Sequence, residues 1–392
     1  MKNVQEFKID EWIRSHGPSS KYGLAGSFTS ALSVQDLKSL SADPDLEVID
    51  SNLKLTYGVS RGSVKLREQI AKLHSSNEKQ LTADNVLLTP GSIMANFLLL
   101  DTICGPGDHV ICQYPTFGQL YLVPKYSGVD VELWKMDEDN DWQLNIEELS
   151  SLIRPNTKAI ILNNPNNPTG AVLGKGFLEQ VISIAHKSDI VVFCDEVFSP
   201  MFFDEPKPPS LVSLGYTKAV VTGSMSKAFS LPGIRVGWIV TENDELLKNI
   251  AIKRDLTTVT VSQLDDSVAS FALDPSVFPN LMHRNISLCK ESRALLEDFV
   301  AANQGYVTGM TPAGSGTAFI KVLDADGKPV DDFAFCKSLA EKEGICVIPG
   351  GHCFGENDDG DFKGYLRITL GTPDVLKEAL PALERFIRQR SF

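Results

Sequence analysis

The sequence predicts an α/β protein with a large domain, built on a mostly parallel sheet covered by helices, and a smaller α+β domain at the C-terminal end. Three observations predict this class. The chain has 392 residues, which is more than one hydrophobic core usually supports. From residue 86, short β-branched runs alternate with helical segments, as is typical of parallel sheets covered on both faces. From about residue 285 this alternation ends, and charged helices and separate strands follow.

The N-terminal residues differ from the rest of the chain. The apolar residues between positions 12 and 33 show no clear period, so we expect an irregular arm that lies over another part of the protein. One short helix is expected at residues 34–40. We therefore divide the chain into an arm that contributes to the small domain (1–45), a large α/β domain (46–284) and a small α+β domain (285–392).

The elements of the two domains follow from local patterns. Residues 63–74 place Leu66, Ile70 and Leu73 on one helical face, and Gly91-Ser92 opens an apolar helix at 93–103. A third helix is expected at 175–187. Strands of the large domain are expected at 86–89, 109–113, 129–133, 159–162, 190–194, 219–222 and 236–240. The small domain should have strands at 317–323, 345–348 and 365–369, a helix at 331–343 and a terminal helix.

The composition argues against several classes of function. Hydrophobic residues make up 43% and charged residues 22%, which are ordinary values for a soluble globular protein. The net charge of −13 argues against partners such as nucleic acid or an anionic membrane, and the first residues have no apolar signal core. Seven cysteines without a C-x-x-C pair favour reduced thiols and a cytoplasmic location. The six histidines are isolated in the sequence, so no metal site is expected.

The stretch from Ser224 to Gly237, Ser-Met-Ser-Lys-Ala-Phe-Ser-Leu-Pro-Gly-Ile-Arg-Val-Gly, follows a buried strand and contains a single lysine, Lys227. Arg235 should make the Lys227 amine easier to deprotonate, and a neutral amine can form a Schiff base with an aldehyde. Ser224 and Arg235 would then hold an anionic group of the same ligand. Taken alone, the stretch could equally be a surface loop with an ordinary lysine.

Other polar and aromatic residues also follow predicted strands, where open α/β sheets bind ligands. Ser92 and Ile93 open a helix whose N–H groups can bind a phosphate. Phe117 could stack on a flat ring, Asn167 lies in a rigid Pro-punctuated loop, and Asp195 ends a buried strand. Each has a simpler explanation as a helix cap, a core ring, a turn or a loop anchor. Together with Lys227 they match what pyridoxal 5'-phosphate (PLP) needs from a protein.

On these residues the sequence resembles the class I/II aminotransferases, which are fold-type I PLP-dependent enzymes. The resemblance extends from about Tyr57 to Arg367. Its most specific parts are Asn167-Pro-Thr-Gly, Asp195-Glu-Val, Ser224-x-Ser-Lys and Gly-x-Arg235-x-Gly. It implies an enzyme that transfers the amino group of an α-amino acid through a Schiff base on Lys227, an external aldimine and a quinonoid intermediate.

The resemblance also implies roles for individual residues. Lys227 would hold the cofactor and carry the proton, and Asp195 would pair with the pyridine nitrogen. Arg367 would bind the substrate α-carboxylate. Tyr57 would reach the phosphate of the neighbouring subunit, which implies a homodimer with shared active sites. The remaining cofactor-binding residues would be Asn167 for the phenolic oxygen (and for substrate), Phe117 for the ring face, and Ser92, Ile93, Ser224 and Arg235 for the phosphate.

Two departures from the family pattern leave an alternative open. The family usually has a tyrosine where this chain has Phe198, so we expect only Asn167 to serve the phenolic oxygen; the alternative is that Phe198 packs in the core and a water or Tyr22 supplies the missing hydroxyl. The arm around Tyr22 lacks the usual Gly-x-Pro signature and looks more like capreomycidine-synthase-type enzymes. The alternative function is therefore a PLP-dependent lyase or cyclase, which would need no keto acid, unlike an aminotransferase. A ligand-sensing domain of a transcription regulator is a third class, and it would require a basic DNA-binding segment that the acidic chain does not show before Tyr57.

Overall fold

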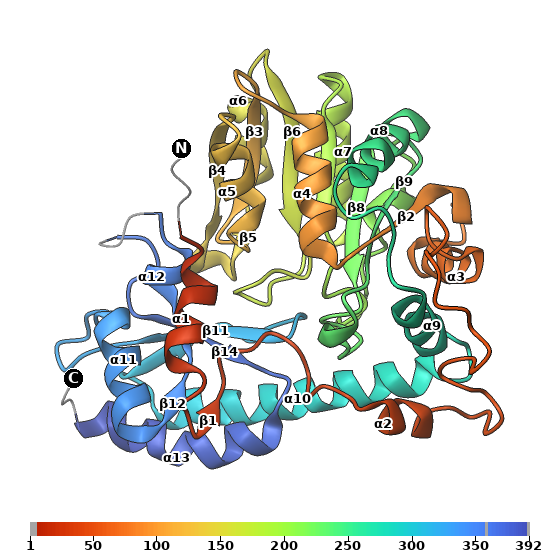
Figure 1. Cartoon of the computed structure of the whole chain (residues 1–392). Coiled ribbons are helices and arrows are strands. Elements are labelled where there is room, and N and C mark those ends of the chain that lie inside the picture. Colours follow the sequence, from red (N-terminus) through yellow and green to blue (C-terminus); the bar gives the residue numbers. More distant parts are fainter. Residues whose placement is uncertain (1–5, 357–359, 390–392) are drawn as a thin grey trace.

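The computed structural model of the chain describes residues 6–356 and 360–389, and it has the predicted fold class, a large α/β part and a smaller α+β part (Figure 1). Within the described residues, the large sheet has the strand order β2-β9-β8-β7-β6-β3-β4-β5. The pairs among β3, β4, β6, β7 and β8 are parallel, whereas β9 runs antiparallel to both of its neighbours and β5 is antiparallel to β4. The strands are β2 (Val86–Thr89), β3 (His109–Tyr114), β4 (Asp130–Asp137), β5 (Gln143–Leu144), β6 (Thr157–Asn163), β7 (Val191–Asp195), β8 (Ala219–Ser224) and β9 (Gly237–Thr241).

Helices cover both faces of this sheet, because alternate residues of each strand are apolar on both sides. Leu87, Ile161 and Phe193 pack with α4 (Ser92–Ile103), α5 (Gln119–Tyr126) and α8 (Asp244–Asp255). Val86 and Val192 pack on the opposite face. The helices of that core are α3 (Val64–His74), α6 (Ile146–Leu152), α7 (Lys175–Lys187) and α9 (Gln263–Ala272).

The small part is an antiparallel sheet with helices beside it. Its strand order is β10-β11-β14-β13, and α10 runs along the base of the molecule from the large part to the small one (Figure 1). Since α10 is a continuous helix of 25 residues, the proposed division at 284/285 falls inside it. The elements are α10 (Phe278–Ala302), β10 (Val307–Gly309), β11 (Thr317–Val322), α11 (Asp332–Glu343), β12 (Ile345–Cys346), β13 (Ile348–Pro349), α12 (Gly350–Phe354), β14 (Tyr365–Thr369) and α13 (Pro373–Gln389). Short 3₁₀ helices occur at Ala83–Asn85, Glu138–Asn140, Leu211–Leu214 and Pro232–Ile234.

The expectation of an irregular N-terminal arm was partly wrong. The helix α1 (Lys8–His16) begins the described chain, and it is followed by the strand β1 (Tyr22–Gly23), which pairs in parallel with β12. Ile9, Trp12 and Ile13 share one face of α1, with a helical spacing that becomes visible only when the segment starts before residue 12. The short helix α2 (Val34–Ser39) is present as predicted, with a capping box between Ser33 and Asp36.

Trp12 anchors α1 to the small part. Its side chain is fully buried, and its indole Nε1–H donates a hydrogen bond to the carbonyl oxygen of Val347 at 2.8 Å. The ring stacks on His16 and meets Phe333 edge to face. A helix of only nine residues is marginal by itself, so this docking must supply most of its stability.

We therefore expect Trp12→Ala to lower the free energy of unfolding by about 3 kcal/mol, the usual loss when a large core ring is truncated. Trp12→Phe keeps most of the buried ring and should lose clearly less. Urea unfolding of the purified protein measures both changes. Arg14→Ala, an exposed position of the same helix, is the control and should stay within about 0.5 kcal/mol of the parent. A Trp12→Ala protein as stable as the Arg14→Ala protein would contradict this account of the docking.

Candidate active site

A cavity of about 310 Å³ lies at the carboxyl ends of the parallel strands. Asp195 ends β7, Asn163 ends β6, and both line the cavity together with the first residue of α4, Ser92. Polar side chains meet here because parallel strands all end at one edge of the sheet. Eight of the ten predicted site residues line this cavity: Ser92, Ile93, Phe117, Asn167, Asp195, Lys227, Arg235 and Arg367.

The other two predicted residues, Ser224 and Tyr57, are not among the cavity-lining residues. Ser224 is buried behind Ser226, whose hydroxyl accepts a hydrogen bond from Ser224 Oγ at 2.8 Å, so Ser226 is the serine of this stretch that faces the cavity. Tyr57 is 83% exposed in a loop before α3. The Gln263 side chain holds that loop by donating to the Tyr57 carbonyl oxygen.

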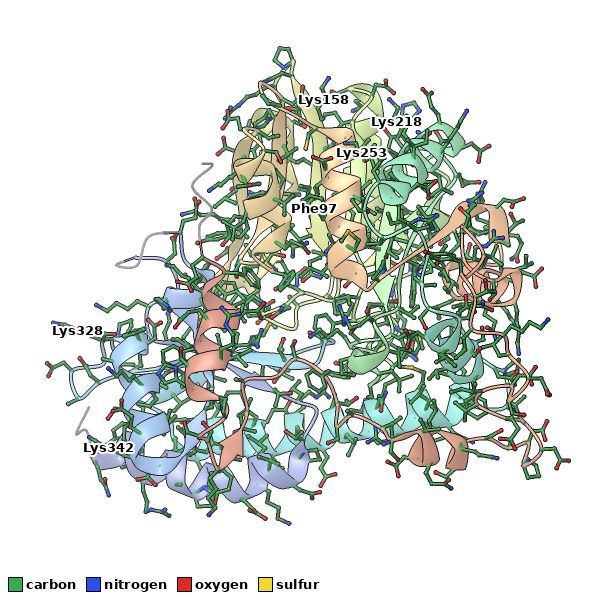
Figure 2. All side chains as sticks on the ribbon, in the orientation of Figure 1. Phe97, Lys158, Lys218, Lys253, Lys328 and Lys342 are labelled. Carbon is green, nitrogen blue, oxygen red and sulfur yellow. The ribbon has the colours of Figure 1, made fainter. Side chains whose placement is uncertain are left out.

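Lys227 opens onto the cavity and is otherwise surrounded by protein. Its Nζ donates a hydrogen bond to Ser27 Oγ at 2.7 Å and lies 5.4 Å from the centre of the Phe28 ring. Burial, together with the positive charges of Arg367 and Arg235, lowers the pKa of Lys227 to about 8. The lysines labelled in Figure 2 lie instead at the outer surface. Lys158 and Lys218, for example, are at the opposite, N-terminal ends of β6 and β8.

Asp195 is 2% exposed, and burial raises its pKa to about 6. Two hydrogen bonds partly offset this rise, one from Asn96 Nδ2 to Oδ2 and one from the backbone N–H of Val197 to Oδ1, both at 3.0 Å. Thr222 Oγ1 donates to Asn96 Oδ1 at 2.7 Å and thereby fixes the orientation of the amide. Asn96 was missed in the sequence, although it lies one helical turn after Ser92 and so on the same face of α4.

An anion-binding corner is formed where α4 meets Arg235. The residue before α4, Gly91, has a φ of 79°, and a Cβ atom there would lie 2.4 Å from Arg235 Nη2. Gly237 has no room for a side chain either, since its Cβ would lie 2.4 Å from the backbone nitrogen of Ser92. Arg235 itself has a left-handed backbone with a φ of 49°, and Nη1 donates to Ser226 Oγ at 3.3 Å. Helix N–H groups, a guanidinium and a hydroxyl therefore converge, as in phosphate sites.

Arg367 lies on β14 and is 2% exposed. Its Nη1 donates to Asn167 Oδ1 at 3.3 Å, its Nη2 donates to the Ala25 and Gly26 carbonyl oxygens, and its Nε has no partner among the described residues. Burial lowers its pKa to about 10, which leaves it charged at neutral pH. A guanidinium held in this way can bind a carboxylate with two parallel hydrogen bonds.

The Asn167 loop is attached to the neighbouring strand. The backbone N–H of Asn167 donates to Asn163 Oδ1 at 2.7 Å, and Asn163 Nδ2 donates to the Asp195 carbonyl oxygen at 2.9 Å. Phe117 lines the cavity and meets the ring of Phe7 edge to face. These bonds fix the loop before any ligand arrives.

The arm supplies cavity-lining residues that the sequence did not reveal. Ser27, Phe28 and residues of α1 line the cavity together with Phe198, which is fully buried. Tyr22, a predicted source of the missing hydroxyl, pairs with β12 and is not among the lining residues. Ser27, which contacts Lys227, is a hydroxyl of the arm that does line the cavity.

Comparison with known proteins identifies the family. The family model for class I and II aminotransferases matches residues 32–383. The chain belongs to the class I and II aminotransferase family. A solved PLP-dependent aminotransferase from Streptococcus suis is 33% identical, has a TM-score of 0.88, and the match covers 100% of this chain and 99% of that one.

Two relatives of this aminotransferase, similar to it to the same degree, are named as different enzymes. Tyrosine aminotransferase of Bos taurus is 26% identical over 92% of this chain and 82% of its own length. Capreomycidine synthase of Streptomyces vinaceus is 26% identical over 89% of this chain and 87% of its own. The predicted fold-type I architecture and the predicted class of enzyme, an aminotransferase acting on amino acids, are thereby confirmed.

The family implies PLP as the cofactor, and the residues present fit it. Asp195 is a buried carboxylate without a cationic side chain bonded to it, which suits a protonated ring nitrogen. The corner at Arg235 suits a phosphate, and Lys227 is an amine of lowered pKa between them. Among residues 6–356 and 360–389, no group of three or more histidine, cysteine or acidic side chains could hold a metal ion, and no helix is long and apolar enough to cross a membrane.

The lowered pKa of Lys227 can be measured in the cofactor-free aminotransferase. Competitive labelling with acetic anhydride at a series of pH values, followed by mass spectrometry, should give half-maximal reactivity of Lys227 near pH 8. The same peptide in denaturant is the control and should titrate near 10.5. Because the folded pKa is lower than the unfolded one, this lysine should destabilise the fold most below pH 8 and cease to do so above 10.5. A folded midpoint at or above 10 would contradict the buried setting described here.

Proposed function

We propose that this aminotransferase binds PLP in the cavity through Lys227 and transfers the amino group of an α-amino acid to a keto acid. One observation carries the proposal: Asp195 and Arg367 are buried and Lys227 is half-buried beside one cavity, and desolvation moves the pKa of each toward the neutral form. Among the described residues, none of the three forms an ion pair with an oppositely charged side chain, although weaker charge interactions with Asp10 and between Asp195 and Lys227 favour the charged forms. A ligand with a cationic ring, an aldehyde and a substrate carboxylate supplies the missing partners.

The residues divide among the parts of the cofactor. Asp195, held by Asn96, would pair with the ring nitrogen, and Phe117 would cover a face of the ring. Arg235 and Ser226, with the N–H groups at the start of α4, would hold the phosphate. Those helix N–H groups are the backbone of Ser92 and Ile93, and Ser224 would act through Ser226, with which it shares a hydrogen bond. Asn167 would donate to the ring oxygen with its amide.

Bound PLP supplies an electron sink that weakens the Cα–H bond of an amino acid. The protein's own part is orientation and proton transfer. Arg367 would bind the substrate α-carboxylate and so aim the Cα–H bond at Lys227 Nζ. With a pKa of about 8, roughly a tenth of the Lys227 amine is neutral at pH 7, against about one part in three thousand for a free lysine. The helix α1 and Phe28 would limit access of water to the proton in transit.

Elimination or ring closure on the same scaffold is the second candidate. Two observations favour keeping it, the relative named capreomycidine synthase and Phe198, whose ring lines the cavity where the family usually has a tyrosine. The two reactions differ in their need for a second substrate. Transamination stops after one turnover unless a keto acid is added, whereas elimination continues.

The test uses the purified holoenzyme and a panel of amino acids without keto acid. We expect one equivalent of keto acid per active site, conversion of the cofactor to its amine form, and further turnover after a keto acid is added. Borohydride reduction before the reaction should attach the cofactor to Lys227, and Lys227→Ala should lower turnover at least about a thousand-fold, the upper range for loss of a general base. Continuous product release without keto acid would favour elimination, and an adduct on the surface residue Lys218 would disprove the role of Lys227.

A homodimer with shared active sites is the second part of the proposal. Tyr57 is exposed and lies outside the cavity of its own chain. Leu55 and Val59 of the same loop are exposed by 74% and 60%, and Leu256, which follows α8, is exposed by 83%; large apolar side chains exposed to this degree favour an interface. A second copy of the chain would bury them and bring Tyr57 to the phosphate of the partner.

Subunit mixing tests the sharing of sites. Lys227→Ala and Tyr57→Ala proteins, each of low activity, should form heterodimers with one site carrying both lesions and one intact site. Random exchange of equal amounts makes half of the dimers mixed, so activity should recover to about one quarter of the parent value. Lys227→Ala mixed with Asp195→Ala is the control and should not recover, because each lesion stays within the site of its own chain. Absence of recovery with verified exchange would place Tyr57 outside the partner's site.

The cellular location and the division into domains remain parts of the proposal. The seven cysteines are free and buried, as is usual in a reducing compartment, which supports the cytoplasm. The contacts of residues 22–24 with residues 344–346 support an arm that belongs with the small part.

A further inference from the structure

The side chain of Asp10 is a charged group of the cavity that the proposed reaction does not use. It lies on α1, whose residues Ile9, Asp10 and Ile13 line the same cavity as Lys227. Asp10 is exposed at the entrance, and its carboxylate accepts no hydrogen bond from a described residue. Against the lowering effect of burial, its charge raises the pKa of both Lys227 and Arg367, so its field reaches both groups.

Among the described charged side chains around the cavity, Asp10 is the one to which the proposed function assigns no ligand group. Five ionisable side chains are among its described lining residues: Asp10, Asp195, Lys227, Arg235 and Arg367. In the proposed function Asp195 faces the ring nitrogen, Lys227 bonds to the cofactor, Arg235 faces the phosphate and Arg367 faces the substrate carboxylate. The negative charge of Asp10 then has no counterpart on the cofactor or on the backbone of the substrate.

The surroundings of Asp10 fit a long side chain. Ile9 and Ile13 of the same helix and Phe28 of the arm give the cavity apolar surface in addition to the carboxylate. Side chains like those of lysine and arginine fit such a surface. Their methylene stems can pack on apolar groups, and their charged ends can pair with a carboxylate at the water-exposed end. An amino acid held by Arg367 with its Cα near Lys227 would extend its side chain within this cavity, whose lining includes Ile9, Asp10 and Ile13 of α1.

We propose that Asp10 binds the positively charged end of the substrate side chain, and that this aminotransferase prefers amino acids with long cationic side chains. The proposal rests on the proposed function, because it places the substrate between Lys227 and Arg367. Anchoring of α1 by Trp12 gives Asp10 a fixed position, so the carboxylate can discriminate between a charged and a neutral end group.

The test compares pairs of amino acids that differ in side-chain charge and little in shape: arginine with citrulline, and lysine with norleucine. For each, the kcat/KM of the holoenzyme and the dissociation constant from calorimetry are measured. The parent enzyme should favour the charged member by about 10- to 100-fold, the range for a hydrogen bond to a charged group. Asp10→Asn should reduce this preference to within about 3-fold and leave citrulline and norleucine unchanged.

Two further variants separate binding from structure. Glu11→Gln changes the next acid of α1, which accepts a hydrogen bond from Ser15 and does not line the cavity, and it should keep the preference. Asp10→Glu keeps the charge and should retain part of the preference. Equal use of both members of each pair by the parent enzyme, or an equal loss for both in Asp10→Asn, would overturn the proposal. In either case turnover of neutral amino acids would leave the proposed function standing, whereas a holoenzyme that transfers no amino group from any donor would reject that function itself.

Discussion

The structure depends on one electrostatic constraint: a carboxylate, an amine and a guanidinium lie beside one cavity, and none of the three forms an ion pair among the described residues. Burial shifts the pKa of Asp195 upward and those of Lys227 and Arg367 downward. Such groups cost folding free energy, so the rest of the fold must hold them. The strand end at β7, the amide of Asn96 and the fixed loop at Asn167 do this with hydrogen bonds that need no ligand. The site is therefore organised before the cofactor binds.

Much of this site was predictable because its residues follow strands or open a helix. Lys227, Asp195 and Ser92 are placed by local sequence, since a parallel sheet brings all its strand ends to one edge. The choice between Ser224 and Ser226 was not predictable. It depends on which way each serine points after β8 ends, and Ser226 is the one that meets Arg235.

The contribution of the arm could not be predicted, because it depends on contacts far apart in the chain. Ser27 reaches Lys227 across 200 residues, and Trp12 is held by a carbonyl oxygen 335 residues away. The helix α1 was missed for a local reason as well. Its apolar face consists of three residues within nine, a weak signal, and docking rather than intrinsic propensity stabilises it. The fold class and the place of Lys227 at the cavity could thus be predicted from the sequence, whereas the contribution of the arm to the cavity lining could not.

Oxygen atoms of the arm accept hydrogen bonds from the two cationic side chains of the cavity, and they therefore compete with a ligand for the same donors. Arg367 donates to the carbonyl oxygens of Ala25 and Gly26, and Lys227 donates to Ser27. If Arg367 binds the substrate carboxylate as proposed, the guanidinium exchanges one oxygen partner for another, and the binding free energy is the difference between two sets of hydrogen bonds. Affinity in this protein is then set as much by how tightly residues 25–27 hold their place as by the fit of the ligand. Substitutions in the arm that never touch a ligand become a route to tune how strongly substrates are held.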